Sequence, residues 1–167
     1  AVSELEHDAR EWAKYAIAKN ILRKTIDRFQ NKYFPELLRK AEEYLSFLTE
    51  GNYIRILPNQ EGSGFLLERK DGFFFEAKEL SQATAEQLYV SLRLALSSVI
   101  YKKLPFPLMI DDSFVNFDSE RVERVFKLLK EMKNNQILFF TCHDHLLKYL
   151  QDQTVIYIGK NELRMSK

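Results

Sequence analysis

Two adjacent carboxylates, Asp111 and Asp112, follow the apolar segment Phe106–Ile110. The apolar run predicts a buried strand over 107–111, so both acids would lie at the C-terminal edge of a parallel sheet, where open α/β sheets bind ligands. Carboxylates so close together repel each other unless a cation or a proton relieves them. Mg²⁺ suits such a pair, because one or two carboxylates and substrate phosphates complete its octahedron. Capping of the following turn is the alternative explanation.

Two later segments could join this edge. Asp118 lies six residues after Asp112, directly before a predicted helix, where it would serve equally well as an N-cap. The next predicted strand, 136–141, is followed by Cys142 and His143. A histidine at the tip of a neighbouring strand could reach a ligand held by the two carboxylates, although a lone histidine there is more often structural.

An upstream turn carries a third candidate. Ser81 and Ala83 open a long predicted helix over 84–102. Backbone N–H groups, a serine hydroxyl and the positive end of the helix dipole together make an anion site. An ordinary capping box is the competing explanation of the same residues.

The elements that must position these groups follow from periodicity. Apolar residues at heptad spacing predict one long helix over 3–34, and the a/d seam favours a coiled coil over a core helix. Pro35 ends that helix or begins the next one, which the pattern places over 37–48. Strands are expected over 53–57, 65–69 and 73–77, the last two joined by the hairpin signal Lys70-Asp71-Gly72.

The remaining pattern alternates helices with strands. It predicts helices over 119–133 and 144–151 and strands over 136–141, 154–158 and 162–165, with a turn at 159–161. This rhythm is typical of an α/β fold with a mainly parallel, covered sheet and, here, a small antiparallel hairpin.

Composition limits the function classes. Lys and Arg number 25 against 24 Asp and Glu, so bulk charge gives no support to nucleic-acid binding. The single cysteine excludes an internal disulfide and favours a reducing, cytoplasmic setting. The apolar runs are far shorter than the about 20 residues of a membrane span, and residues 1–25 are charged throughout, so we expect no membrane segment or signal peptide.

The order of these motifs resembles the C-terminal lobe of ABC-type ATPase heads, specifically the SMC/SbcC-like family and its bacterial YhaN-type branch. Residues 80–87 resemble the signature motif, 108–112 the Walker B strand and 113–118 the D-loop, and His143 is similar to the switch histidine. The resemblance covers about residues 35–167, the C-terminal half of a P-loop NTPase head. Residues 1–34 then fit the end of the returning coiled-coil arm.

The resemblance implies roles for individual residues. Asp111 would hold Mg²⁺, Asp112 would polarise the attacking water, and His143 would contact the γ-phosphate of ATP. The signature residues Ser81, Ala83 and Gln87 would bind a nucleotide held by a second head.

Around these, the D-loop residues Asn116 and Asp118 would lie at the interface between the heads. The family also implies DNA repair or chromosome metabolism, DNA as a ligand and a calcineurin-like nuclease partner.

Two departures and one absence qualify this resemblance. Ala83 stands where the general signature has glycine, and Asp112 replaces the commoner, longer glutamate. The five glycines allow no Gly-x-x-x-x-Gly-Lys-[Ser/Thr], so the phosphate cradle is missing. The chain also begins in the middle of a heptad pattern, so we expect a piece of a longer protein whose N-terminal lobe carries Walker A. Alone, the chain would hydrolyse no ATP.

Other functions fit less well. A degenerate head that dimerises without hydrolysis is the principal alternative, supported by Ala83 and Asp112. A phosphate-receiver domain lacks its third strand-end aspartate and the lysine beyond it. Cysteine catalysis lacks an oriented base, because Cys142 and His143 are sequence neighbours. Zinc binding by Cys142, His143 and His145 lacks a fourth ligand and the ordinary spacing.

Overall fold

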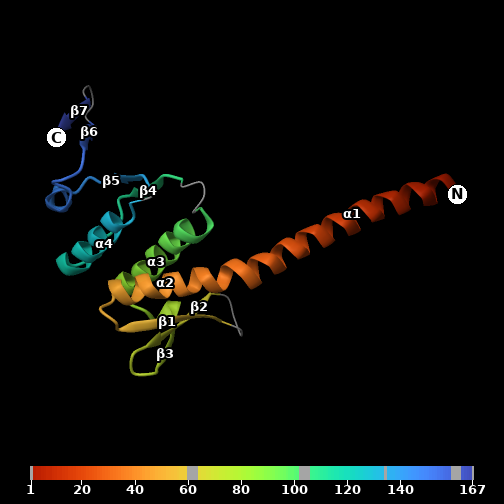
Figure 1. Cartoon of the computed structure of the whole chain (residues 1–167), viewed down its shortest axis with the longest axis horizontal. Helices are drawn as coiled ribbons and strands as arrows, with labels where there is room; N and C mark the ends of the chain where they lie inside the picture. Colours follow the sequence, from red (N-terminus) through yellow and green to blue (C-terminus); the bar gives the residue numbers. More distant parts are fainter. Residues whose placement is uncertain (1, 60–63, 102–105, 134, 159–162, 167) are drawn as a thin grey trace.

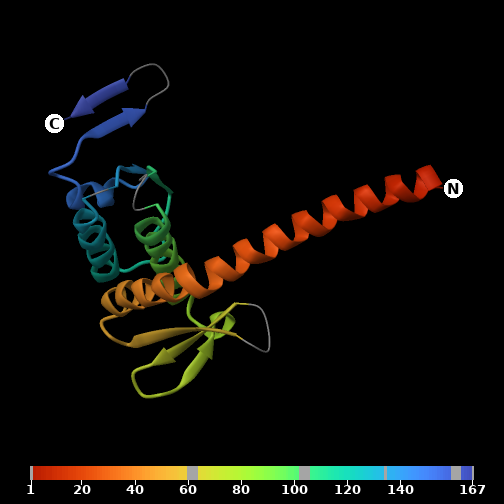
Figure 2. The same ribbon diagram turned by 45° about the vertical axis from the view of Figure 1, so that its right-hand side comes forward.

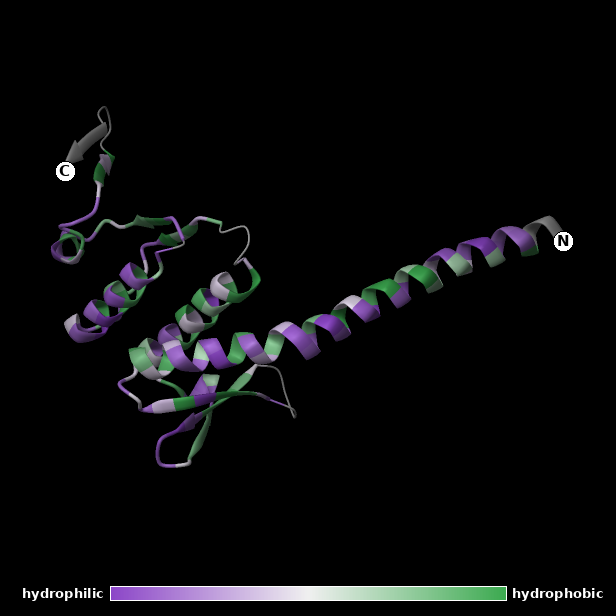
Figure 3. Ribbon diagram, viewed as in Figure 1, coloured by the Kyte–Doolittle hydropathy of each residue, from purple (hydrophilic) through white to green (hydrophobic). Residues whose placement is uncertain are grey.

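A long N-terminal helix projects from a small body of helices and strands. The computed structural model describes residues 2–59, 64–101, 106–133, 135–158 and 163–166 (Figure 1). Helix α1 (Val2–Arg28), which we call the arm, makes the projection. Its apolar side chains face solvent, and Trp12 is 73% exposed. Apolar and polar bands alternate along the arm (Figure 3). The predicted long helix is confirmed, and its pairing in a coiled coil stays a prediction.

The arm continues into the body without a break. A π-helical turn, η1 (Phe29–Tyr33), joins α1 to α2 (Phe34–Leu48). Pro35 therefore begins a helix, one of the two predicted outcomes, and lies in its first turn. The Phe34 N–H donates to the Phe29 carbonyl across the wider turn. Because proline has no N–H to donate and its ring crowds the preceding turn of an α-helix, the change in hydrogen-bond spacing suits its position.

An antiparallel sheet follows α2. Gly51, with φ of 72°, reverses the chain after the helix. Strands β1 (Tyr53–Pro58), β2 (Phe65–Arg69) and β3 (Phe74–Glu76) pair in the order β1-β2-β3. Gly72, with φ of 84°, makes the tight turn between the last two strands, which confirms the predicted hairpin.

The second half of the chain alternates helices and strands. Its elements are η2 (Ala77–Glu79), α3 (Gln82–Ile100), β4 (Leu108–Asp111), α4 (Ser119–Glu131), β5 (Ile137–Phe140), η3 (Asp144–Tyr149), β6 (Val155–Ile158) and β7 (Leu163–Ser166). The predicted helix over 144–151 is a 3₁₀ segment. The turn expected at 159–161 and the expected strand residue Glu162 lie outside the described residues.

The mixed α/β class is confirmed, but the description as mainly parallel holds only for one pair of strands. Strands β4 and β5 pair in parallel, whereas β1-β2-β3 and the hairpin of β6 and β7 are antiparallel. That hairpin stands apart from the other strands (Figure 2). The sequence predicts the two strands of this hairpin and the turn between them, but an apolar pattern does not specify whether they also join the parallel strands.

The core lies on both sides of α2, which packs against α3, β1 and α4. One apolar cluster joins α2 and α3 to the antiparallel sheet: Leu37, Ala41, Leu45, Ile56, Leu67, Leu88 and Ala95. The other gathers around α4 beneath β4 and β5: Leu48, Leu94, Phe114, Val122, Val125, Phe126, Leu128, Leu129, Met132 and Leu146. The inner faces of β4 and β5 rest on this second cluster.

The outer face of β4 and β5 corrects the prediction of a buried strand over 107–111. Met109 is 71% exposed, and its partner Leu138 and the next outer residue, Phe140, are also exposed. The sequence of β4 is apolar on both faces, and this pattern is the one expected of a strand that is buried on both sides. Only the inner face has a packing partner among the described residues.

Candidate functional site

Strands β4 and β5 end together and bring the predicted site residues to one edge. The register pairs Asp111 with Phe140, and the Asp112 N–H donates to the Phe140 carbonyl at 2.9 Å. Residues 111–112 and 141–143 therefore leave the sheet side by side, and we call these five residues the acidic edge. His143 therefore lies at the tip of the neighbouring strand, close to Asp112, and its contact with a ligand stays a prediction.

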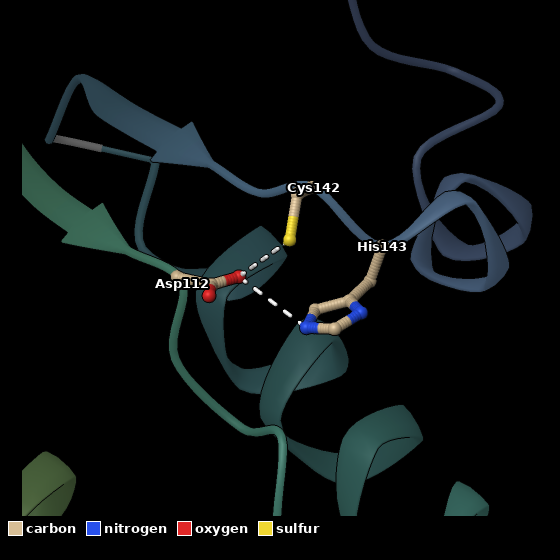
Figure 4. A group of neighbouring side chains, drawn as sticks. All are labelled: Asp112, Cys142 and His143. Carbon is tan, nitrogen blue, oxygen red and sulfur yellow. Dashed lines mark hydrogen bonds and ion pairs between the residues drawn. The ribbon is translucent and has the colours of Figure 1, made fainter.

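Three ligating side chains meet at this edge (Figure 4). Asp112 Oδ1 lies 3.4 Å from His143 Nε2, and the Cys142 thiol donates to the same oxygen at 3.6 Å. We call Asp112, Cys142 and His143 the edge cluster. The Asp112 side chain is 51% exposed and that of His143 is 31% exposed, so a ligand can approach from solvent.

The backbone around the edge cluster is held in an unusual shape. Asp112 and Phe114 both have positive φ, 40° and 72°. This conformation is unfavourable for residues other than glycine, although aspartate tolerates it better than most. Phe114 is buried and stacks on Phe139 with ring centroids 6.0 Å apart. On the other strand, the His143 N–H donates to Thr141 Oγ1. The buried phenylalanine thus anchors the turn that presents Asp112.

Asp111, the predicted magnesium ligand, is exposed on the other side of the strand. Alternation along β4 places it on the outer face with Met109. Among the residues that the structure describes, the edge cluster includes Asp112 and leaves Asp111 outside. The two carboxylates are therefore directed differently, and their mutual repulsion does not by itself require a cation.

Ser81 caps helix α3. Its Oγ accepts a hydrogen bond from the Thr84 N–H at 3.2 Å and lies 2.8 Å from Thr84 Oγ1. The N-cap part of the capping-box explanation is confirmed, and Ser81 is also exposed at the surface. Ala83 lies in the first turn with its methyl buried, and its φ is not positive. The helix therefore forms here without the conformational freedom of the glycine that the general signature carries.

Gln87 faces the core. Its side chain is 1% exposed, and its Nε2 donates to the Leu48 carbonyl at 2.6 Å. The same carbonyl accepts a second bond, at 3.3 Å, from Nε of Arg124, which also pairs with Glu50. The Gln87 amide therefore satisfies an orphan carbonyl at the end of α2, and this contact gives no support to the prediction that Gln87 binds a nucleotide.

The segment between β4 and α4 lies beside the first turns of α3. Asn116 Nδ2 donates to Glu86 Oε1 of α3 at 2.5 Å. Asp118 caps α4 by accepting from the Arg121 N–H at 2.9 Å, and its other oxygen lies 3.5 Å from Arg121 Nε. Both Asn116 and Asp118 are exposed. The N-cap explanation of Asp118 is confirmed, and its surface position leaves a second role open.

The sequence analysis considered Cys142 as a nucleophile and as a zinc ligand with His143 and His145, but it did not predict the position of Cys142 beside Asp112. Strand alternation would direct Cys142 and His143 to opposite faces, but β5 ends at Phe140 and both side chains turn toward Asp112. The signal was present as a cysteine next to a histidine at a strand end. It could not be interpreted without the path of the loop.

The comparisons with known proteins agree with this architecture. The chain is 35% identical to the uncharacterised protein YhaN of Bacillus subtilis (strain 168) over 156 residues, or 92% of the chain. It spans only 16% of the length of YhaN. No protein-family model matches the chain.

Two solved structures share its fold at low sequence identity. One, from a study of ATP-driven dimerisation and DNA-stimulated activation of SMC ATPases, matches with a TM-score of 0.61 and 19% identity, over 89% of this chain and 88% of the other. The other is an Smc head domain with a coiled coil and joint derived from Pyrococcus yayanosii. It matches with a TM-score of 0.63 and 16% identity, over 95% of this chain and 31% of the other.

The fold is therefore that of SMC head domains, with the C-terminal part of the head covered. The resemblance to the YhaN-type branch, drawn from the order of the motifs, is confirmed by the similarity to YhaN. Over the residues that the structure describes, none of the helices combines the length and apolar character that a membrane span requires.

Proposed function

We propose that this chain is the C-terminal lobe of an ATP-hydrolysing SMC-type head. The observation that carries the proposal is the meeting of Asp112 and His143 at the carboxyl edge of the parallel β4–β5 pair, in a fold shared with SMC ATPases. The carboxyl edge of parallel strands is where α/β proteins bind ligands. An acid and an imidazole 3.4 Å apart at that edge suit phosphoryl transfer, in which positioning and charge neutralisation do most of the catalysis.

The residues at the acidic edge divide the chemistry between them. Asp112, half-exposed and fixed by the Phe114 anchor, would orient the attacking water and take its proton. The His143 ring, held beside it, would donate to a γ-phosphate oxygen. Asp111 offers one carboxylate to Mg²⁺, and one carboxylate with substrate phosphates is an ordinary magnesium site. When bound, the metal ion supplies charge neutralisation at the transferred phosphoryl group.

The rest of the ATP site would come from another segment. The chain has no P-loop and spans 16% of the length of YhaN, so we infer an N-terminal Walker A lobe. The outer face of β4 and β5 supports this inference, because parallel strands are normally covered on both faces and Met109, Leu138 and Phe140 are exposed. Elements of the missing lobe would cover this face, and its strands would pair with the edges of β4 and β5 to extend the sheet.

A second head would complete the catalytic unit. Ser81 lies exposed at the start of α3, where first-turn N–H groups, including that of Ala83, point away from the helix. These groups would bind the γ-phosphate of ATP held by the partner head. Asn116 joins the D-loop to α3 through Glu86, so the exposed Asp118 and the signature turn would meet the partner as one surface.

The cellular setting is proposed from the resemblance alone. The arm, with its exposed heptad residues, would pair with an outgoing helix as the end of a coiled coil over residues 1–34. ATP-driven closure of two heads in the cytoplasm, acting on DNA in repair or chromosome metabolism with a calcineurin-like nuclease, is the task that the family implies.

A non-hydrolysing head that serves only for dimerisation is the second candidate. It is favoured by Asp112, whose side chain is one carbon shorter than the glutamate common at this position, since a displacement of about 1 Å can cost about 10²-fold in rate. The two candidates differ in a single measurable quantity, the steady-state turnover of ATP by the assembled head.

Turnover assays with the two lobes test the proposal. The 167-residue chain alone is expected to hydrolyse no ATP above background, and addition of the N-terminal lobe should produce turnover. In the assembled head, Asp112→Ala should abolish hydrolysis and trap an ATP-bound dimer, whereas Asp144→Ala, at an exposed acid just beyond the edge cluster, should not. If the Asp112→Ala dimer dissociated in ATP as fast as the unsubstituted one, the role of Asp112 would be wrong.

A further inference from the structure

The edge cluster has the spacing of a metal site of a different kind from the proposed magnesium site. Zinc binds nitrogen at about 2.0–2.1 Å, carboxylate oxygen at about 2.0–2.2 Å and sulfur at about 2.3 Å. With tetrahedral angles, these bond lengths place nitrogen about 3.4 Å and sulfur about 3.6 Å from the oxygen. The observed separations from Asp112 Oδ1 are 3.4 Å to His143 Nε2 and 3.6 Å to Cys142 Sγ.

The remaining distance, between Cys142 Sγ and His143 Nε2, is also compatible with a tetrahedral site. The three ligand atoms of the cluster all lie within 4.8 Å of one another. Figure 4 shows the thiol and the imidazole both directed at the carboxylate, from a loop that follows β5. Cys142 is exposed and His143 only partly buried, so a small side-chain rotation brings sulfur and nitrogen to the tetrahedral separation.

The donor set selects the ion. A thiolate and a carboxylate together balance the charge of a divalent cation, and a neutral imidazole completes a mixed sulfur, nitrogen and oxygen set. Sulfur and imidazole donors favour zinc and similar transition metals, whereas Mg²⁺ prefers oxygen donors alone. The set also differs from Cys142, His143 and His145, because the carboxylate of Asp112, which lies close to both other donors, takes the place of the His145 imidazole.

We propose that Asp112, Cys142 and His143 bind one Zn²⁺ ion through Oδ1, Sγ and Nε2, with a water molecule in the fourth position. Binding releases the thiol proton to solvent, because the thiolate is the ligand. Three protein ligands and an open position are typical of catalytic zinc sites. This consequence rests on the proposed function: bound zinc would occupy the carboxylate and the imidazole that hydrolysis needs. Zinc would therefore inhibit the ATPase, and Cys142 would make the head sensitive to zinc.

Cobalt substitution tests the site without any reference to ATP. The chelator-treated chain is titrated with Co²⁺ under reducing conditions and followed by absorption. One equivalent should produce a thiolate-to-cobalt charge-transfer band together with the strong visible absorption of tetrahedral Co²⁺, and Zn²⁺ should displace both. Both features should be lost in Cys142→Ser and in Asp112→Asn and His143→Gln, with circular dichroism used to confirm folding.

Matched variants distinguish the proposed set from its neighbours. Asp111→Asn and His145→Gln change the adjacent carboxylate and the adjacent imidazole, and both should keep the cobalt spectrum. Absence of the charge-transfer band in the unsubstituted chain would overturn the proposal. Persistence of the band in both Asp112→Asn and His143→Gln would also overturn it, because the cysteine alone would then bind the metal. Loss of the band in His145→Gln with its retention in Asp112→Asn would overturn it as well.

The inhibitory consequence has its own test in the assembled head. Zn²⁺ should lower ATP turnover in the unsubstituted protein and much less in Cys142→Ser, when each protein is compared with its own turnover in the absence of Zn²⁺. A positive cobalt spectrum with no basal turnover would refute the proposed function and leave the zinc site standing. Absence of the cobalt spectrum in an active head would refute the zinc site and leave the proposed function standing.

Discussion

Replacement of Gln87 by leucine should destabilise the body of the protein by about 1–3 kcal/mol, the cost of leaving a buried acceptor unsatisfied. The Gln87 side chain is 1% exposed and donates to the Leu48 carbonyl at 2.6 Å, while Arg124 Nε reaches the same carbonyl at 3.3 Å. Leucine has a similar size but is apolar, so it fills the same space and removes the shorter hydrogen bond. The carbonyl then depends on the longer bond alone.

Urea unfolding followed by circular dichroism measures this cost. With a slope of about 1–3 kcal/mol per molar urea, a loss of about 2 kcal/mol lowers the midpoint by about 1 M. Gln82→Leu, at an exposed position of the same helix, is the matched control and should change stability by less than about 0.5 kcal/mol. The double variant Gln87→Leu and Arg124→Met should lose more stability than the sum of the two single variants, because both donors to one carbonyl are removed. Equal stabilities of Gln87→Leu and Gln82→Leu would refute the reasoning.

Three other predictions concern single elements. Asp118→Ala should cost about 1 kcal/mol through loss of the α4 N-cap, whereas Ser119→Ala should cost less, as measured by the same urea assay. Leu45→Ala, at a fully buried position, should cost about 2–5 kcal/mol, and Leu5→Ala on the exposed arm should change the unfolding midpoint little; equal effects would contradict the assignment of the core. The hydrogen bond from Arg69 lowers the pKa of Asp71, so Arg69→Gln should raise that pKa toward its ordinary value in an NMR titration. Because the folded-state pKa is the lower one, the stabilisation by this pair is present above the unfolded-state pKa and is lost as the pH falls through the folded-state pKa.

Local sequence signals predicted the elements because each depends on chemistry within a few residues. The Lys70-Asp71-Gly72 turn needed only a glycine able to adopt positive φ, and the periodicity of the arm needed no partner to be visible. The Ser81 and Asp118 caps followed from residue type and position. The order of the motifs along the chain also indicated the SMC-type fold correctly.

Long-range contacts could not be predicted in the same way. The burial of Gln87 depends on a carbonyl 39 residues earlier in the chain, and its polar side chain gave no sign of the core. The pairing of β6 with β7 and the exposed outer face of β4 are properties of neighbours, which an apolar pattern does not specify. Cys142 joined the site because a loop ended the strand alternation, a change that residue types alone do not reveal.

The proposed location of the nucleotide can be observed directly through the histidine rings. The chain has three histidines, so selective labelling gives three ring signals for His7, His143 and His145. The labelled chain is assembled with the N-terminal lobe and titrated with a non-hydrolysable ATP analogue and Mg²⁺. This location of the nucleotide predicts a large shift of the His143 ring, a smaller shift of the His145 ring and no shift of the His7 ring on the arm. Saturable nucleotide binding that leaves the His143 ring unchanged would contradict it.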